Sequence, residues 1–327
     1  MTMANSGSEP VTLPTDLRIA TPMHHVVIFA VLLGLLLLAP FVLYPVFLMK
    51  VLCFALFASA LNLLLGYGGL LSFGHAAFFG SASYVSAHVA KVWGLTPELA
   101  ILFGTGAAAL LGLGIGALAI RRTGIYFAMV TLAFAQMVFF LALQVPFTGG
   151  EDGIQAVPRG KLFGLIDLSN DLTLYFVVLL IVFGGLMLIY RIIHSPFGQV
   201  LKAIRDNEPR SISLGYKVNR YKLAVFVMSA TLAGLAGATK AIVFQLASLT
   251  DVYWTMSGEV VLMTLLGGMG TIFGPFVGAG LIVTMENYFA GFGAWVTVLQ
   301  GIVFVITVLL FREGIVGVIA RWTKKSL

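Results

Sequence analysis

Long apolar runs alternate with short polar or glycine-rich interruptions along almost the whole chain. A polar stretch of about 20 residues comes first, and about ten apolar segments of a length suited to membrane helices follow. The segments are 26–43, 46–65, 70–89, 97–120, 124–143, 172–190, 221–246, 255–266, 272–289 and 295–311. A helix that crosses the hydrocarbon core needs about 20 residues. The pattern therefore predicts an all-α, polytopic integral membrane protein with about 10 transmembrane or membrane-embedded helices.

Composition supports this prediction and excludes an ordinary soluble domain. Hydrophobic residues make up 60% of the chain and charged residues 10%, and the mean hydropathy is +1.03. Soluble domains carry about 25% charged residues. A net charge of +6 would favour a nucleic-acid partner in a soluble protein, but the basic residues here collect at the ends of apolar runs. The positive-inside bias of membrane proteins accounts for that placement, so we expect membrane lipid around the chain and no nucleic-acid partner.

One long polar segment, residues 191–222, interrupts the apolar pattern, and we call it the basic island. It holds seven of the 19 Lys and Arg residues but only two acidic residues, so it should lie in the cytoplasm. Ser195 and Pro196 are typical of a helix N-terminus, Pro209 ends this helix, and Gly215 can close a second short turn. The apolar face of the first helix is formed by Val200, Leu201, Ala203 and Ile204. A simple connector needs neither capped helices nor an apolar face, so we expect a docking surface.

Counting the segments gives a membrane topology. It places the N-terminus, Arg121 and Arg122, the basic island and the C-terminus on one side, so parity and charge agree. The expected organisation is a cytoplasmic polar tail (1–22), one transmembrane domain (23–320) and a cytoplasmic tail (321–327). The polar loop 144–171 lies outside. Lys50 and Lys91 do not fit, because both fall on the outer side.

Glycine-rich runs interrupt two of the apolar segments and predict broken helices there. We call 66–69 the first break and 267–270 the second break. They belong to a weak echo at a spacing of 200 residues, in which Leu65, Gly68, Phe73, Gly74 and Gly80 recur as Leu265, Gly268, Phe273, Gly274 and Gly280. Breaks at corresponding positions indicate a solute path between broken helices. If the echo is a true repeat, the two breaks face a common cavity; chance matches among abundant glycines are the alternative.

The sequence contains little chemistry for catalysis. A phosphate-binding Gly-x-x-x-x-Gly-Lys-Ser/Thr loop, a His-Glu-x-x-His motif and a Gly-x-Ser-x-Gly motif are all absent, so we expect no ATP site, no metal site and no nucleophile in this chain. Among the ionisable residues inside apolar segments, the functional candidates are His75, His88, Lys240, Glu259 and Glu286. Such residues are costly in hydrocarbon. We expect His88, Lys240 and Glu259 to reach the interface, and His75 and Glu286 to line a hydrated path.

The scarcity of acidic groups bears on the energy source. An ion-coupled carrier usually needs acidic groups at mid-membrane, and only Glu286 qualifies. The residues alone therefore favour a transporter subunit that is driven by a separate cytoplasmic protein docked on the basic island. An ion-coupled carrier and a membrane scaffold or enzyme are the alternatives.

Four stretches carry a family resemblance. They are 65–80 (LGYGGLLSFGHAAFFG), 148–153 (TGGEDG), 195–215 (containing SPFG, AIRDNE and LG) and 267–275 (GGMGTIFGP). Together they resemble the LivM-type permease subunits of bacterial ABC importers for branched-chain amino acids. The resemblance implies a multi-pass protein of the bacterial inner membrane with both termini in the cytoplasm, which translocates aliphatic amino acids by alternating access. Urea or short amides are alternative substrates.

The resemblance also implies partners and site residues. The partners are a LivH-type second permease, two cytoplasmic ATPase subunits that bind the ATP and Mg, and a periplasmic amino-acid-binding protein; no cofactor is expected in this chain. The expected ATPase-coupling residues are Phe197, Gly198, Lys202, Ala203, Arg205, Asp206, Asn207, Glu208, Ser211, Leu214 and Gly215. The expected translocation path comprises Gly66, Gly68, Gly69, Ser72, Phe73, His75, Gly267, Gly268, Gly270 and Glu286.

Two further expectations follow. Family members usually carry small alanines where this chain has residues 209–213 (PRSIS), so we expect poor exchange with a relative's ATPase. Exposed backbone groups at the two breaks, helix N-termini and apolar walls would suit a zwitterionic amino acid with an aliphatic side chain.

Overall fold

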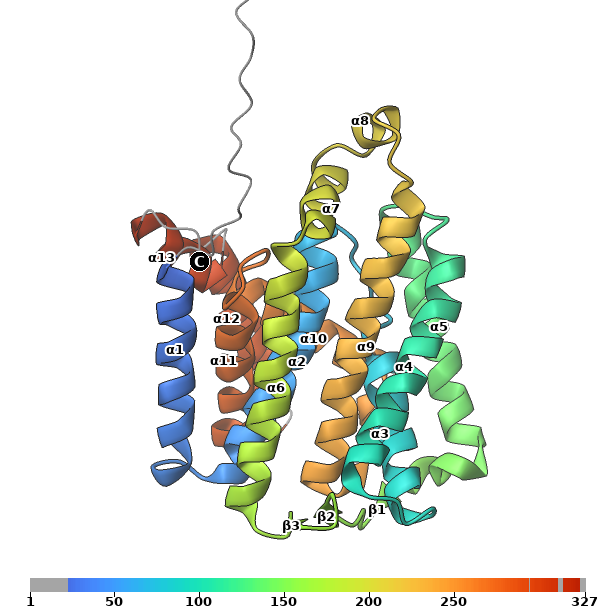
Figure 1. Ribbon diagram of the computed structural model, residues 1–327, viewed down its shortest axis with the longest axis vertical. Helices are drawn as coiled ribbons and strands as arrows, with labels where there is room; N and C mark the ends of the chain where they lie inside the picture. The colour runs from blue at the N-terminus through green and yellow to red at the C-terminus, as the bar shows by residue number, and fades with distance from the viewer. Residues whose placement is uncertain (1–22, 294, 311–313, 324–327) are drawn as a thin grey trace, which may run out of the picture.

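The computed structural model describes residues 23–293, 295–310 and 314–323, and this part of the chain is a bundle of α-helices with two small two-stranded sheets (Figure 1). The apolar helices are α1 (Met23–Leu38), α2 (Pro45–Asn62), α3 (His75–Lys91), α4 (Pro97–Ala119), α5 (Ile125–Gln144), α6 (Asp171–Ile193), α9 (Val218–Phe244), α10 (Trp254–Gly267), α11 (Gly274–Phe289) and α12 (Trp295–Leu310). The predicted all-α polytopic membrane fold is confirmed.

Five of these elements are long and apolar enough to cross a membrane on their own. They are α2 with its π-helical continuation η2 (Leu63–Tyr67), α4, α5, α6 and α9. The other apolar helices are shorter, and α10 has only 14 residues. The predicted partial crossing of residues 255–266 therefore appears in the structure as a short helix.

Helices α2 and α9 form the centre of the bundle. Helix α9 packs along α2, α3 and α4, and α2 also contacts α6, α10 and α11. Small residues make the α4–α9 contact close, because a Cβ at Gly112 would lie only 2.5 Å from the Ala230 Cβ. Close backbone approach through small residues is the usual way in which helices associate in lipid.

The short helices outside the apolar set and the strands lie at the two ends of the bundle. Helices α7 (Pro196–Asp206), α8 (Glu208–Ser213) and α13 (Gly314–Thr323) lie at the upper end in Figure 1. The strands β1 (Ile154–Gln155), β2 (Lys161–Leu162), β3 (Ile166–Asp167) and β4 (Leu246–Ala247) belong to the opposite end. Strand β1 pairs antiparallel with β4, with Ile154 opposite Ala247, so the 144–171 loop is attached to the segment that follows α9.

Two element assignments differ from the sequence prediction, one at α3 and one at the C-terminal tail. Helix α3 begins at His75 rather than at residue 70, because the glycine-rich chain leaves the helix after Tyr67 and re-enters only beyond Gly74. Residues 321–323, placed in the tail by the sequence, are part of α13. The predicted tail 1–22 and the end of the C-terminal tail, 324–327, lie outside the described residues.

Candidate coupling surface and the two breaks

The basic island folds into two capped helices. The Ser195 hydroxyl oxygen accepts a hydrogen bond from the Gly198 amide (3.3 Å), and Asn207 Oδ1 accepts one from the Arg210 amide (3.0 Å). These caps start α7 and α8, and Gly215 follows with a φ of +86°. The predicted helix that opens at Pro196, and the second short turn after it, are confirmed.

The structure shows which side of α7 is buried against the bundle. Leu201 and Ile204 are buried, but Ala203 is exposed. The four residues of the predicted apolar face therefore do not share one environment, because packing buries Leu201 and Ile204 and leaves the Ala203 side exposed. Exposure leaves Ala203 free for contact with another protein.

Other coupling candidates fall into two groups. Leu214, just after α8, is exposed. Ile212 of α8, which was not a candidate, is also exposed and lines a hollow of about 310 Å³. The hollow is lined by Glu208, Ile212, Lys217, Val218, Asn219 and Arg220. In contrast, Gly198 and Ser211 are buried, so they shape the surface without forming part of it.

Ion pairs and ring contacts attach this surface to the bundle. Lys222 Nζ lies 2.7 Å from Glu208 Oε1, which ties α8 to α9. The Phe197 ring stacks on the Tyr221 ring of α9, with centroids 5.5 Å apart. The α7–α8 unit is therefore held by α9 as well as by its own chain connections.

The basic island also contacts the first break directly. Arg205 donates from Nη1 to the Gly66 carbonyl oxygen (2.5 Å), and its Nε and Nη2 donate to Asp206 Oδ1 (3.1 and 3.0 Å). The Lys202 ammonium lies over the Tyr67 ring, 5.6 Å from its centroid. Burial and the nearby Arg205 charge lower the pKa of Lys202.

The two breaks are in contact with each other. Asn62 donates from Nδ2 to the Thr271 carbonyl oxygen (2.7 Å) and accepts at Oδ1 from the Gly270 amide (2.9 Å). A Cβ at Gly66 would lie 2.6 Å from the Gly270 nitrogen, so only glycine permits this approach. The sequence predicted two breaks facing a common cavity; the structure brings them together as packed backbone. Whether the echo is a true repeat stays a prediction.

Several amide groups at the starts of the helices after the breaks already have hydrogen-bond partners. At the start of α3, three side-chain hydroxyls accept from the backbone: Thr131 from Phe73 (3.2 Å), Ser72 from Gly74 (3.2 Å) and Ser257 from Ala76 (2.8 Å). At the start of α11, the Thr271 hydroxyl accepts from Gly274 (3.1 Å). In this conformation these amide groups are therefore not available to a substrate carboxylate.

His75 is buried in the bundle. Its Nε2 lies 2.8 Å from the Ser229 hydroxyl, and Ser229 gives its own hydrogen to the Ala60 carbonyl oxygen (2.5 Å). His75 Nε2 is therefore the donor of the pair. The rings of Phe78 and Phe226 lie edge-on to the imidazole.

The predicted path residues differ in how far they are buried. Six of them are buried: Gly66, Gly68, Ser72, His75, Gly267 and Gly268. Gly69 is exposed, and Phe73 and Gly270 are intermediate.

Glu286 lies apart from the breaks in an ion pair. Its Oε2 is 3.0 Å from Lys50 Nζ on α2, and the Glu259 carboxyl of α10 lies beside it. The pair explains why Lys50 did not fit the charge pattern, since its charge is compensated. Lys91 likewise donates to the Gln155 carbonyl oxygen (2.7 Å).

Lys240, one turn before the end of α9, is held inside the bundle by an ion pair. It is buried, and its Nζ lies 2.6 and 2.7 Å from the two carboxylate oxygens of Asp251. A buried ammonium is costly unless an opposite charge lies beside it, and Asp251, which follows the end of α9, supplies that charge. His88 stacks on Phe147 with centroids 4.0 Å apart.

Sequence reasoning missed Asn62, although a signal was present. An amide side chain within an apolar run, one helical turn before Gly66, indicates a hydrogen bond to another segment, because a lone amide in lipid is costly. The sequence did not show that the partner would be the main chain 208 residues away.

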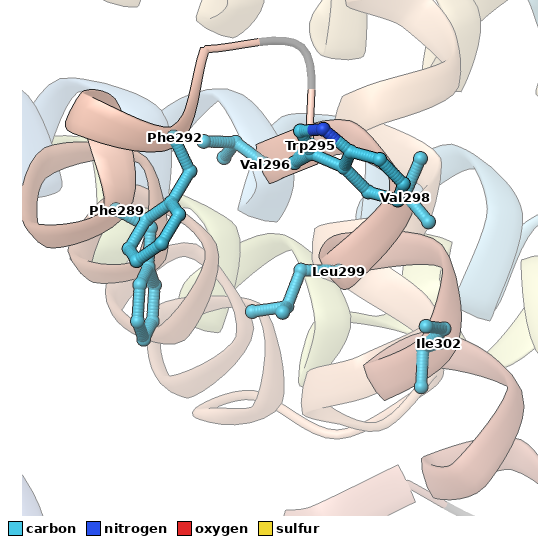
Figure 2. Close-up of a pocket in the computed structure, with 7 residues that line it drawn as sticks. All are labelled: Phe289, Phe292, Trp295, Val296, Val298, Leu299 and Ile302. Atoms are coloured by element: carbon cyan, nitrogen blue, oxygen red, sulfur yellow. The ribbon is translucent and has the colours of Figure 1, made fainter.

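A separate apolar pocket of about 400 Å³ lies where α11 turns into α12 (Figure 2). Its lining consists of Phe289, Phe292, Trp295, Val296, Val298, Leu299 and Ile302. These side chains carry no charge, so the pocket has nothing to pair with the ammonium or carboxylate of an amino acid. It does not contribute to the predicted path.

Comparison with known proteins identifies relatives of the chain. The family model "Branched-chain amino acid transport system / permease component" matches residues 45–310. The chain is 30% identical over 278 residues to the high-affinity branched-chain amino acid transport system permease protein LivM of Escherichia coli K12, covering 78% of this chain and 65% of that protein. It is 29% identical over 195 residues to the ribose import permease protein RbsC of Bacillus subtilis, covering 55% and 58%.

A third relative is the probable branched-chain amino acid transport permease protein LivH of Methanocaldococcus jannaschii, 27% identical over 161 residues and covering 46% of this chain and 50% of that protein. The chain thus spans about two thirds of the length of the LivM relative and less of the others. No solved structure matches it. Because the family match extends through the breaks, the basic island and the apolar helices, the chain belongs to the family of branched-chain amino acid transport system permease components.

Proposed function

We propose that this chain is the transmembrane permease subunit of an ATP-driven importer that moves branched-chain, aliphatic amino acids across the bacterial inner membrane. The observation that carries the proposal is the α7–α8 surface. It combines two capped short helices, exposed Ala203 and Leu214 and a hollow beside α8, and Arg205 ties it to the first break. The family of the chain supports a transport role, and the LivM relative supports this substrate class.

The proposed assembly places ATP chemistry outside this chain. Two cytoplasmic ATPase subunits bind ATP and Mg and dock on α7–α8, a LivH-type permease completes the membrane part, and a periplasmic protein delivers the amino acid. Nucleotide binding changes the relative energies of inward-open and outward-open states, and hydrolysis resets them. The end that carries α7, α8 and α13 faces the cytoplasm, so both termini lie there.

The breaks are the proposed site of substrate passage. In the described conformation they are closed, since Asn62 bridges them and side-chain hydroxyls occupy the amides of α3 and α11. Passage requires them to separate, which frees backbone groups that suit a carboxylate at a helix N-terminus. Urea and short amides would meet the same groups, so the test includes them.

A docking test decides whether the α7–α8 surface binds the ATPase. Ala203→Arg adds a long charged side chain to the exposed face, and Thr123→Arg, exposed in the turn after α4, is the matched control. We expect the ATPase that co-purifies with the wild-type permease to fall at least ten-fold in Ala203→Arg and to stay in Thr123→Arg. Equal co-purification with both variants would contradict docking at α7.

Uptake into proteoliposomes that hold the whole complex tests the energy source and the substrate. We expect leucine or valine uptake to require ATP and to continue when a protonophore is added. Uptake that follows the proton gradient would identify an ion-coupled carrier and direct attention to Glu286. Uptake of urea with no uptake of leucine would support the ATP-driven importer and contradict the proposed amino acid substrate.

A further inference from the structure

The Gly66 carbonyl oxygen occupies a special place at the end of the long helix formed by α2 and η2. The helix ends at Tyr67, and the next amides bond elsewhere: Gly69 donates to Leu65 and Leu70 to Leu64. Carbonyl groups at a helix end need partners from outside the helix. For Gly66 that partner is the Arg205 guanidinium, at 2.5 Å and 139 residues further along the chain.

Arg205 fits this position closely. A Cβ at Gly69 would lie 2.7 Å from Arg205 Cγ, so the aliphatic part of the arginine lies against the backbone of the first break. Asp206 accepts from Nε and Nη2 and thereby fixes the plane of the guanidinium. The planar guanidinium thus makes hydrogen bonds to both Asp206 and Gly66, and it forms a rigid connection between α7 and the first break.

The connection continues to the second break. Gly66 lies against the Gly270 backbone, and Asn62, one turn earlier on α2, bonds to the Gly270 amide and the Thr271 carbonyl. Beyond it, a Cβ at Gly314, the first residue of α13, would lie 2.4 Å from Gly268 Cα. A displacement of α7 would therefore reach the first break through Arg205, and the second break through the Gly66–Gly270 approach and Asn62.

We infer that Arg205 is a positioning residue that transmits movement of α7 to the two breaks, so that docking and opening are separable functions of the same helix. Its aliphatic part and guanidinium face the first break, while Ala203 faces outward for the ATPase. The inference rests on the proposed function, because it requires a protein that moves α7.

The experiment compares Arg205→Ala, Arg205→Lys and Arg122→Ala in the full complex in proteoliposomes. Arg122 is an exposed arginine in the turn after α4, so its replacement removes the same charge at the same end. We expect Arg205→Ala to keep the ATPase and its hydrolysis but to lose at least ten-fold in amino acid taken up per ATP hydrolysed. Arg205→Lys should recover part of this ratio, because one ammonium can donate to Gly66 but cannot also hold Asp206 in the same plane.

A second measurement does not depend on the solute. Met269 is 51% exposed in the second break, and the native Cys53 is fully buried, so Met269→Cys can be labelled with a maleimide over a low background. We expect nucleotide to change the labelling rate in the Met269→Cys complex and to have no effect once Arg205→Ala is added. Loss of coupling in both measurements supports transmission.

The outcomes separate this inference from the proposed function. An unchanged ratio and a retained labelling response in Arg205→Ala overturn the inference while the importer stands. Loss of the ATPase from Arg205→Ala also overturns it, since Arg205 is then a docking contact. If wild type shows the labelling response but takes up no amino acid, the substrate proposal fails and the Arg205 inference stands. If no ATPase accompanies wild type, the proposed function fails and the inference with it.

Discussion

Asn62 and Arg205 act on the main chain of other segments. Asn62 uses both ends of its amide on the second break, and Arg205 uses one nitrogen on the first. Contacts of this kind leave no pattern of side-chain types in the partner segment, which explains why sequence reasoning selected Arg205 for docking and missed Asn62. The glycines of the breaks were predictable; their partners were not.

Replacement of Asn62 should destabilise the closed breaks. Asn62→Ala leaves the half-buried Gly270 amide and Thr271 carbonyl without this partner, and loss of a partner by a fully buried group costs about 1–3 kcal/mol, which is the upper range here. We expect a lower thermal midpoint for the purified permease in detergent, measured by tryptophan fluorescence. Asn287→Ala, exposed on α11, is the control and should leave the midpoint within about one degree of wild type, because surface substitutions usually change stability by less than about 0.5 kcal/mol. Equal midpoints for both variants would contradict the bridging role.

At the scale of the element, α7 is a short amphipathic helix whose stability depends on its ends. Sequence reasoning correctly predicted the Ser195 cap, the place of Pro196 at the first helical position and the end of the helix before Pro209, because these signals are local. It did not show which side of α7 would be buried, because the rotation of a helix about its axis is set by what it packs against, here α6, α9 and η2. Local signals determined where α7 begins, and tertiary packing determined which side is exposed.

The cap of α7 can be tested by hydrogen exchange. Ser195→Ala removes the hydroxyl that accepts from the Gly198 amide, and loss of an N-cap costs about 1 kcal/mol. Opening of residues 196–206 should then become about five-fold more frequent, seen as faster deuterium uptake by mass spectrometry. Ser213→Ala, an exposed serine at the end of α8, should leave uptake in this segment unchanged. Faster uptake in both variants would point to a general loosening of the island.

The buried pair between α9 and the segment after it should matter more than an exposed pair. Asp251→Asn leaves the Lys240 charge buried without compensation, which costs about 3–5 kcal/mol. Asp171→Asn breaks a pair in which the carboxylate is 40% exposed, which costs about 0–1 kcal/mol. Thermal midpoints in detergent should fall clearly for the first variant and slightly for the second. Adding Lys240→Met to Asp251→Asn should restore most of the loss; no recovery would show that Asp251 acts through its cap on Ser248 instead.

At the scale of the whole molecule, the number of apolar helices and their order along the chain were predictable from hydropathy. The distribution of charge between the two ends was predictable as well, apart from Lys50 and Lys91. Those exceptions could not be resolved from the sequence, because their partners lie on distant segments: Glu286 for Lys50 and the Gln155 carbonyl for Lys91. The pairing of β1 with β4, and helix α13, were also missed, since neither has a strong periodic signal over its short length.

The proposed orientation can be checked by labelling single cysteines in intact cells. Thr123→Cys and Ser213→Cys lie at the α7–α8 end, and Leu165→Cys is 87% exposed at the β2–β3 turn of the opposite end. A membrane-impermeant maleimide should label position 165 in intact cells and positions 123 and 213 only after the membrane is opened. Labelling of position 213 in intact cells would show that the α7–α8 end faces the outside, and it would exclude a cytoplasmic docking surface there.

The ion pair between Lys50 and Glu286 has a consequence for the time course of synthesis. The two residues are 236 positions apart, and Glu286 is on the penultimate apolar helix. At a synthesis rate of about 5–20 residues per second, Lys50 waits roughly 10–50 s before its partner leaves the ribosome. During that interval its ammonium must stay hydrated at the membrane surface. The Lys50 end of α2 therefore lacks its compensating carboxylate until nearly the whole chain has been made.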